Sequence, residues 1–225
     1  MAKKGNEFVC QSCGAVYPKW QGKCDACGEW NTIVEEKIGG EGFSNITPKK
    51  KGKMIDFVPL SGEERALDRI KTNIKELDRV SGGGLVPSSV ILVGGDPGIG
   101  KSTLLLQVCA SIAGSAGNPE CYYISGEEAI DQVRIRAKRL RLEQSPVKLA
   151  SATEVKDIIA TLEKSNAAVV IIDSIQTMYL DEVESTPGSV AQVRACAYEL
   201  IKLAKRKGFV LFLVGHVTKQ GSIAG

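Results

Sequence analysis

Residues 95–103 read GDPGIGKST and match the pattern G-x4-G-K-[ST], which is typical of loops that bind nucleotide phosphates. An apolar run at residues 90–93 precedes this stretch, and a helix-like run at residues 103–112 follows it. Glycines in such a loop let backbone N–H groups converge on phosphates at the amino end of the next helix. We therefore predict a phosphate-binding loop made of Gly95, Asp96, Pro97, Gly98, Ile99, Gly100, Lys101, Ser102 and Thr103.

The side chains of the loop indicate which ligand it takes. Lys101 can bridge the β- and γ-phosphates of a nucleotide, and the Ser102 hydroxyl can hold Mg²⁺. Enzymes that bind guanine usually carry an N/T-K-x-D signature, and the nearest string, TKQG at residues 218–221, lacks the aspartate. The sequence therefore favours ATP with Mg²⁺ over GTP.

The pattern around the loop predicts an α/β fold. From about residue 56, short apolar runs alternate with amphipathic helical runs, as in a mainly parallel sheet. The expected strands are residues 90–93, 121–124, 147–150, 168–172 and 210–214. The clearest helix covers residues 189–206, with Gly208 placed to end it. We predict a RecA-like P-loop NTPase core over residues 56–225.

Polar residues at the ends of these strands are candidates for catalysis. Asp173 ends an apolar strand and suits a Walker B role in holding Mg²⁺. Glu127 follows another strand and is the first choice to activate water, with Glu128 as the alternate. Both glutamates could instead be acids favoured in the first turn of a helix. His216 could sense the γ-phosphate or lie in a solvated loop.

Four cysteines in two pairs predict a metal site in residues 1–34. Each Cys-x2-Cys turn can place two thiolates on one side of a tight loop, and two such turns form a tetrahedral cage for zinc. The expected ligands are Cys10, Cys13, Cys24 and Cys27. Four protein ligands leave no open position, so the zinc is structural. Residues 35–55 are rich in Gly, Lys and Glu and are expected to be a flexible linker.

Composition is typical of a globular protein, with 43% hydrophobic and 24% charged residues and a net charge of +3. No apolar run approaches the roughly 20 residues that cross a bilayer, and no secretory signal opens the chain. We expect a cytoplasmic protein whose remaining cysteines, Cys109, Cys121 and Cys196, are buried core residues.

These motifs together resemble the bacterial RadA (Sms) DNA-repair family, over nearly the whole chain except the linker. Besides the phosphate loop, the resemblance rests on PKWQGKC at residues 18–24, WNT at 30–32, ELDRV at 76–80, GGGLVP at 82–87, YISGEE at 123–128 and VGHVTK at 214–219. Few families join this zinc module to this ATPase.

The resemblance implies more than the spacing does. It implies a RecA-like core in hexameric rings that binds single-stranded and branched DNA and drives branch migration, beside recombinase or replication proteins. By the RecA pattern, Glu127 matches the catalytic glutamate and His216 the γ-phosphate sensor. Residues 178–189 match a first DNA-facing loop, and residues 219–225 begin a second.

Family members continue with further strands, a basic motif and a Lon-protease-like domain, so we expect a C-terminally incomplete ATPase domain. On this interpretation residues 209–214 form an exposed sheet edge, and the chain binds nucleotide but hydrolyses it slowly.

Other interpretations stay open. The chain could be a RecA-like ATPase that acts on protein partners, or a docking protein that uses its zinc module to bind a helicase or recombinase. A small-molecule kinase is disfavoured, because nothing resembles a lid over an acceptor substrate. The basic run at residues 134–141 is either a solvated helix face or a contact with DNA or a neighbouring subunit.

Overall fold

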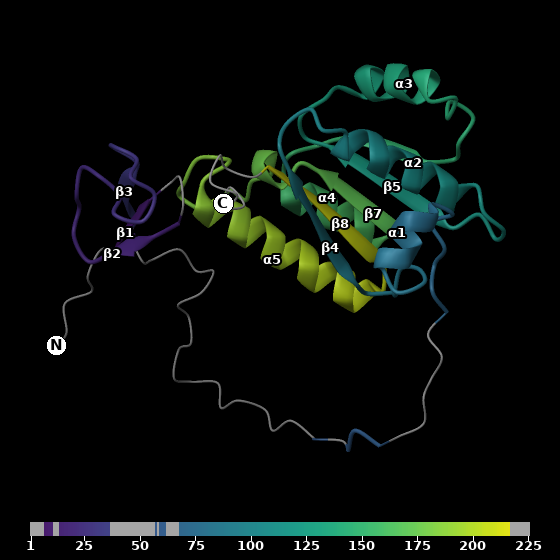
Figure 1. Cartoon of the computed structure of the whole chain (residues 1–225), viewed down its shortest axis with the longest axis horizontal. Coiled ribbons are helices and arrows are strands. Elements are labelled where there is room, and N and C mark those ends of the chain that lie inside the picture. Colours follow the sequence, from purple (N-terminus) through teal and green to yellow (C-terminus); the bar gives the residue numbers. More distant parts are fainter. Residues whose placement is uncertain (1–6, 11–13, 37–56, 58, 62–67, 217–225) are drawn as a thin grey trace.

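A computed structural model describes residues 7–10, 14–36, 57, 59–61 and 68–216 (Figure 1). The predicted linker at residues 35–55 lies outside this range except for its first two residues. The described part comprises a small antiparallel sheet near the N-terminus and a larger α/β unit. Within the described residues, no helix is long and apolar enough to cross a membrane.

The N-terminal sheet has three strands in the order β2-β1-β3. Its strands are β1 (Glu7–Cys10), β2 (Val16–Tyr17) and β3 (Ile33–Glu36). Both pairings are antiparallel, and Cys10 lies opposite Ile33. Among the described residues of this part, the buried cluster consists of Cys10, Cys24 and Ile33. A core this small does not stabilise a domain by itself.

The larger unit is built on five parallel strands in the order β4-β8-β7-β5-β6. Its strands are β4 (Val90–Gly95), β5 (Glu120–Ser125), β6 (Lys148–Ser151), β7 (Ala167–Asp173) and β8 (Val210–His216). Its helices are α1 (Lys75–Val80), α2 (Lys101–Ala113), α3 (Ile130–Arg139), α4 (Val155–Glu163), α5 (Val190–Lys207) and the 3₁₀ turn η1 (Ile175–Thr177). All five predicted strands are confirmed, with bounds that differ by one or two residues.

The prediction that residues 209–214 form a sheet edge is wrong. In this fold β8 is inserted between β4 and β7, so it has a partner on each side. Among the residues that the structure describes, β4 and β6 form the edges of this sheet. The error arose because order along the chain does not give order in a parallel sheet, where connections cross over other strands.

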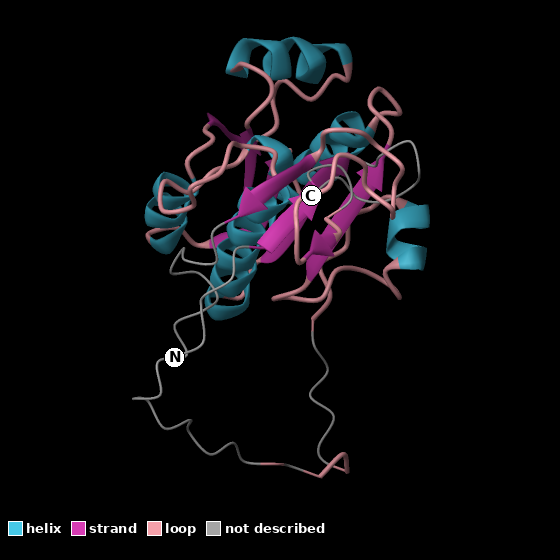
Figure 2. Ribbon diagram, turned by 90° about the vertical axis from the view of Figure 1, so that its left-hand side faces the viewer, coloured by secondary structure: helices cyan, strands magenta, loops and turns pink. Residues whose placement is uncertain are grey.

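Alternate residues of the central strands point to opposite faces, and helices cover both (Figure 2). On β7, Val170 and Ile172 pack towards α4 and α5, whereas Val169 and Ile171 pack towards α2. This double burial explains why the strand reads as a continuous apolar run. The three cysteines predicted to be buried, Cys109, Cys121 and Cys196, lie in these two cores, which confirms that prediction.

Helix α5 begins and ends at the residues that its sequence indicates. The Ser189 hydroxyl accepts a hydrogen bond from the backbone N–H of Gln192, and Gly208 follows the helix with a φ of 90°. Gln192 itself is buried, which the apolar periodicity did not predict. Its side chain binds both backbone groups of Leu180 and the carbonyls of Val183 and Ser185. Gln192 thus holds the segment that leads into α5.

The glycines that follow α5 and α2 allow a matched test of how backbone conformation affects stability. Gly208 has a φ of 90°, whereas Gly114 ends α2 with a φ of −85°. A side chain in the left-handed region costs about 1–2 kcal/mol, partly offset by lower entropy of the unfolded chain. We expect Gly208→Ala to lower the free energy of unfolding by about 1 kcal/mol and Gly114→Ala to lower it much less, both measured by urea denaturation. Equal losses in the two variants would contradict this.

Candidate nucleotide site and zinc module

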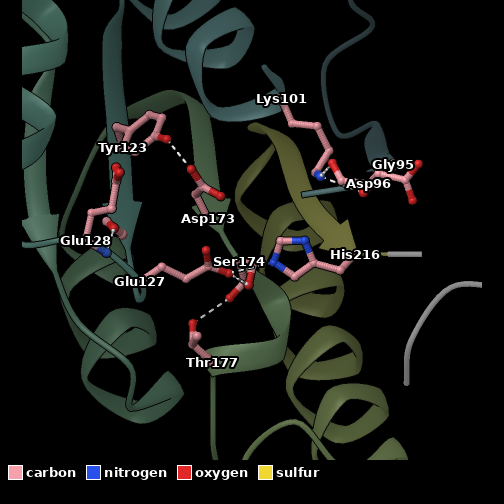
Figure 3. A network of polar contacts seen from close by, with 11 residues as sticks. Gly95, Asp96, Lys101, Tyr123, Glu127, Glu128, Asp173, Ser174, Thr177 and His216 are labelled. Carbon is pink, nitrogen blue, oxygen red and sulfur yellow. Dashed lines mark hydrogen bonds and ion pairs between the residues drawn. The ribbon is translucent and has the colours of Figure 1, made fainter. Parts of the chain in front are cut away.

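The carboxyl ends of the parallel strands bring the predicted site residues to one edge of the sheet. In the β4–β8 ladder Gly95 is opposite His216, and in the β5–β7 ladder Ser125 is opposite Asp173. The phosphate loop, the segment after β5 and the ends of β7 and β8 therefore meet (Figure 3). This is the edge where open α/β sheets bind ligands.

The loop between β4 and α2 has the form of a phosphate cradle. Gly100 is the N-cap of α2 and has a φ of 99°, a conformation that disfavours any side chain. A Cβ placed on Gly98 or Gly100 would meet no atom within 4 Å, so ligand atoms can approach the backbone there. Lys101 is 8% exposed, and its ammonium lies 2.6 Å from the carbonyl oxygen of Gly95 and 2.8 Å from that of Asp96. The positive charge is thus held at the mouth of the loop.

Glu127 lies among polar groups from two other strands. Ser174 donates a hydrogen bond to its Oε1, and His216 Nε2 is 2.8 Å from the same oxygen (Figure 3). Partial burial acts to raise the pKa of Glu127, but the bonds with Ser174 and His216 and the charge of Lys101 outweigh it and lower that pKa. Glu127 is therefore held as a carboxylate between Ser174 and His216, and the charge of Lys101 acts on it, which suits a residue that positions water.

The neighbouring Glu128 has a different environment. Its carboxylate forms an ion pair with Arg136 of α3, and the Arg136 side chain is only 14% exposed. Arg136 therefore does not belong to a solvated basic face, unlike Arg134 and Arg139, which are exposed. An ion pair occupies Glu128, whereas Glu127 faces His216 and the loop, and this geometry favours Glu127 over Glu128.

Gly126 allows the segment after β5 to lie directly against η1. A Cβ on Gly126 would overlap Thr177 Oγ1 and lie 2.8 Å from Met178 Cε, so only glycine fits without displacement. Thr177 in turn donates a hydrogen bond of 2.9 Å to the carbonyl of Ser174. The segment that carries Glu127 is therefore packed against residues 174–178, which lead into the segment held by Gln192.

Sequence reasoning missed Tyr123, Ser174 and Arg136. The Tyr123 hydroxyl donates a hydrogen bond to Asp173 Oδ2, and both side chains are almost fully buried. The sequence did hold one indication for Tyr123: it lies inside an apolar strand, and a buried hydroxyl group needs a hydrogen-bond partner. Ser174 carried no signal, and Arg136 was noted only as part of the basic run at residues 134–141, because their partners are 47 and 8 residues away.

The donor set at this edge fits Mg²⁺. Ser102 in the first turn of α2 and Asp173 at the end of β7 offer a hydroxyl and a carboxylate oxygen, and Mg²⁺ prefers such hard oxygen ligands together with phosphate oxygens. Only one oxygen of Asp173 accepts from Tyr123. The residues present therefore suit a magnesium ion brought in with a nucleotide.

Three of the four predicted zinc ligands meet in the N-terminal module. The sulfur atoms of Cys10, Cys24 and Cys27 all lie within 4.8 Å of one another, and those of Cys10 and Cys27 are 3.7 Å apart. Sulfurs at about 2.3 Å from one tetrahedral zinc are separated by about 3.8 Å, whereas a disulfide needs about 2.05 Å. The fourth predicted ligand, Cys13, lies outside the described residues.

The surroundings of Cys24 favour the thiolate that a metal requires. Burial acts to raise its pKa, but hydrogen bonds from the Tyr17 phenol and from Cys27 and Ala26 outweigh burial and lower that pKa to about 6. The Tyr17 oxygen lies 3.1 Å from Cys24 Sγ. Tyr17 therefore lines the metal site, while Trp20 and Trp30 are 58% and 67% exposed on the module's surface. The fit to zinc is good on distance, donor type and ionisation.

Comparison with known proteins matches both parts of the chain. Residues 61–222 match the family model described as an AAA domain, and residues 8–35 match one described as a rubredoxin metal binding domain. The chain is 50% identical to the DNA repair protein RadA of Brucella abortus, 47% to that of Bacillus subtilis and 44% to that of Pseudomonas aeruginosa. In each case the alignment covers 100% of this chain and 49–50% of the relative, so the chain spans about half the length of these proteins.

The zinc module gives a direct analytical test. We expect elemental analysis to find one zinc per chain, because four thiolates satisfy a tetrahedral ion. Cys24→Ser should lose most of the zinc, since it removes a buried ligand, whereas Cys196→Ser, which removes a buried thiol of the α/β core, should retain it. Zinc-free wild-type protein, or equal zinc in both variants, would contradict the assignment.

Proposed function

This chain belongs to the RadA family of DNA repair proteins, and on that premise we propose that it is a DNA-dependent ATP hydrolase that acts on recombination intermediates. The family membership rests on the whole-chain identity to RadA proteins and on the AAA domain. The observation that carries the proposal is the meeting of Lys101, Asp173, Glu127 and His216 at one edge of the sheet. The proposed setting is the cytoplasm, where chromosomal DNA of bacteria is found.

Each residue has a proposed part in hydrolysis. Backbone N–H groups of residues 95–103 and the Lys101 ammonium bind the phosphates, while Ser102 and Asp173 hold Mg²⁺. A bound magnesium ion supplies charge stabilisation on the phosphate oxygens. The Glu127 carboxylate orients the attacking water and accepts its proton, and His216, which contacts Glu127, is placed to respond to loss of the γ-phosphate.

The remaining parts of the proposal come from the family. We infer a homo-oligomeric ring in which a neighbour completes the site, single-stranded and branched DNA as substrate, and recombinase or replication proteins as partners. The segment at residues 178–189 is proposed to face DNA, as is the segment at 219–225, which lies outside the described residues. The first of these is linked through Ser174 to Glu127, which gives a physical route between DNA and the water-positioning carboxylate.

Hydrolysis tests the roles of the two glutamates. Glu127→Gln should leave ATP affinity within about threefold and lower turnover by about 10²–10⁴, the usual contribution of general base catalysis. Glu128→Gln should mainly lower the thermal unfolding midpoint, because it leaves Arg136 without its carboxylate partner. Lys101→Ala should abolish tight binding and serves as the control for the site itself. Turnover that stops in Glu128→Gln and persists in Glu127→Gln would reverse the assignment.

Salt dependence tests the DNA part of the proposal. Binding to single strands should weaken with a log–log slope of about −0.7 per neutralised phosphate, so three contacts cost about 20-fold over a fourfold rise in salt. Lys219→Gln should reduce the slope by about 0.7, whereas Arg139→Gln on α3 should leave it unchanged if that face is solvated. ATP turnover should rise when single-stranded DNA is added. Salt-independent binding without stimulation would favour an ATPase that acts on protein partners.

A further inference from the structure

Tyr123 places a hydroxyl group inside an otherwise apolar core, next to the proposed magnesium site. It lies on β5 opposite Ile171 of β7 and is 1% exposed. Its ring packs in the cluster that covers the α2 face of the sheet. At the end of the ring, the hydroxyl donates to Asp173 Oδ2, and Figure 3 shows the two side chains pointing toward each other.

The contact with Asp173 also affects the acidity of the phenol. Burial, then the charge of Asp173 and the hydrogen bond to it, raise the pKa of Tyr123 well above its usual range. The charge of Arg136 and the nearby Ser102 act in the opposite direction on this pKa. Because an ionised carboxylate can only accept a hydrogen bond, the phenol is the donor in this contact. The hydroxyl is thus bonded to Asp173, one of the two residues that are proposed to hold Mg²⁺.

Packing alone does not explain a tyrosine at this position. A phenylalanine would fill the same apolar space, whereas a buried hydroxyl is costly unless it is bonded. Tyr122 gives the contrast on the same strand. Its side chain lies on the other face, where its hydroxyl donates to Glu120 at 2.7 Å and accepts from Lys148 at 3.2 Å, away from the phosphate loop.

We propose that Tyr123 is a positioning residue of the magnesium site, whose hydroxyl fixes the orientation of the Asp173 carboxylate. One oxygen of Asp173 is held by Tyr123, which would leave the other to bind a magnesium ion or its water shell. Groups that hold metal ligands in this way commonly change metal affinity by 10–100-fold when removed. The inference rests on the proposed ATP·Mg²⁺ site.

The experiment separates magnesium binding from nucleotide binding and from folding. The affinity of the full chain for a fluorescent, non-hydrolysable ATP analogue is measured in EDTA and over a Mg²⁺ series, for wild type, Tyr123→Phe and Tyr122→Phe. Thermal unfolding of each variant confirms that folded molecules are compared. We expect Tyr123→Phe to raise the Mg²⁺ concentration for half-maximal tightening by about 10-fold or more, with affinity in EDTA within twofold of wild type. Tyr122→Phe should match wild type in both measurements.

A double variant keeps the proposal falsifiable. If Tyr123 acts through Asp173, Tyr123→Phe added to Asp173→Asn should cause little further loss of Mg²⁺ response, because residues that act as one unit are not additive. Superimposable Mg²⁺ titrations for wild type and Tyr123→Phe, or a full additional loss in the double variant, would overturn the proposal and leave the hydroxyl as a tether between β5 and β7. Wild-type protein without any Mg²⁺-dependent nucleotide binding would instead overturn the proposed function.

Discussion

Parallel pairing of β7 with β5 on one side and β8 on the other is the constraint on which the site depends. In a parallel sheet all carboxyl ends lie at the same edge, so residues far apart in the chain reach one place. Asp173 ends β7, Glu127 follows β5, and His216 ends β8. Because β7 is buried on both faces, packing holds its carboxyl end in place, and the side chains around that end are positioned relative to it.

At that edge, polar side chains are held mainly by one another. Asp173 is bonded to Tyr123, Glu127 to Ser174 and His216, and Glu128 to Arg136. Buried polar groups without partners are costly, so such a network favours one arrangement of side chains. Two adjacent glutamates consequently have different environments, although the sequence presents them as equivalent. The network continues through Ser174 and Thr177 towards the segment that Gln192 holds.

The N-terminal module is stabilised by other means. Its strands are short, and only Cys10, Cys24 and Ile33 form a buried cluster among its described residues. Burial of so little apolar surface does not offset the loss of chain entropy, so zinc binding supplies folding free energy in modules of this kind. The 3.7 Å between two sulfurs and the lowered pKa of Cys24 are both consistent with a thiolate cage.

The sequence by itself determined the glycine-rich loop after β4, the strands, the helix between Ser189 and Gly208 and the grouping of Cys10, Cys24 and Cys27, because each depends on local spacing. A glycine-rich loop, an apolar run or a Cys-x2-Cys turn can be recognised from about ten consecutive residues. Only the tertiary structure decided the strand order, in which β4 and not β8 lies at an edge of the described sheet. It also decided the hydrogen-bond and ion-pair partners of Tyr123, Ser174, Arg136 and Gln192. Those features depend on which distant segments pack together. Crossover connections and buried hydrogen bonds produce no repeating pattern in a single amino-acid sequence, so they cannot be read from it.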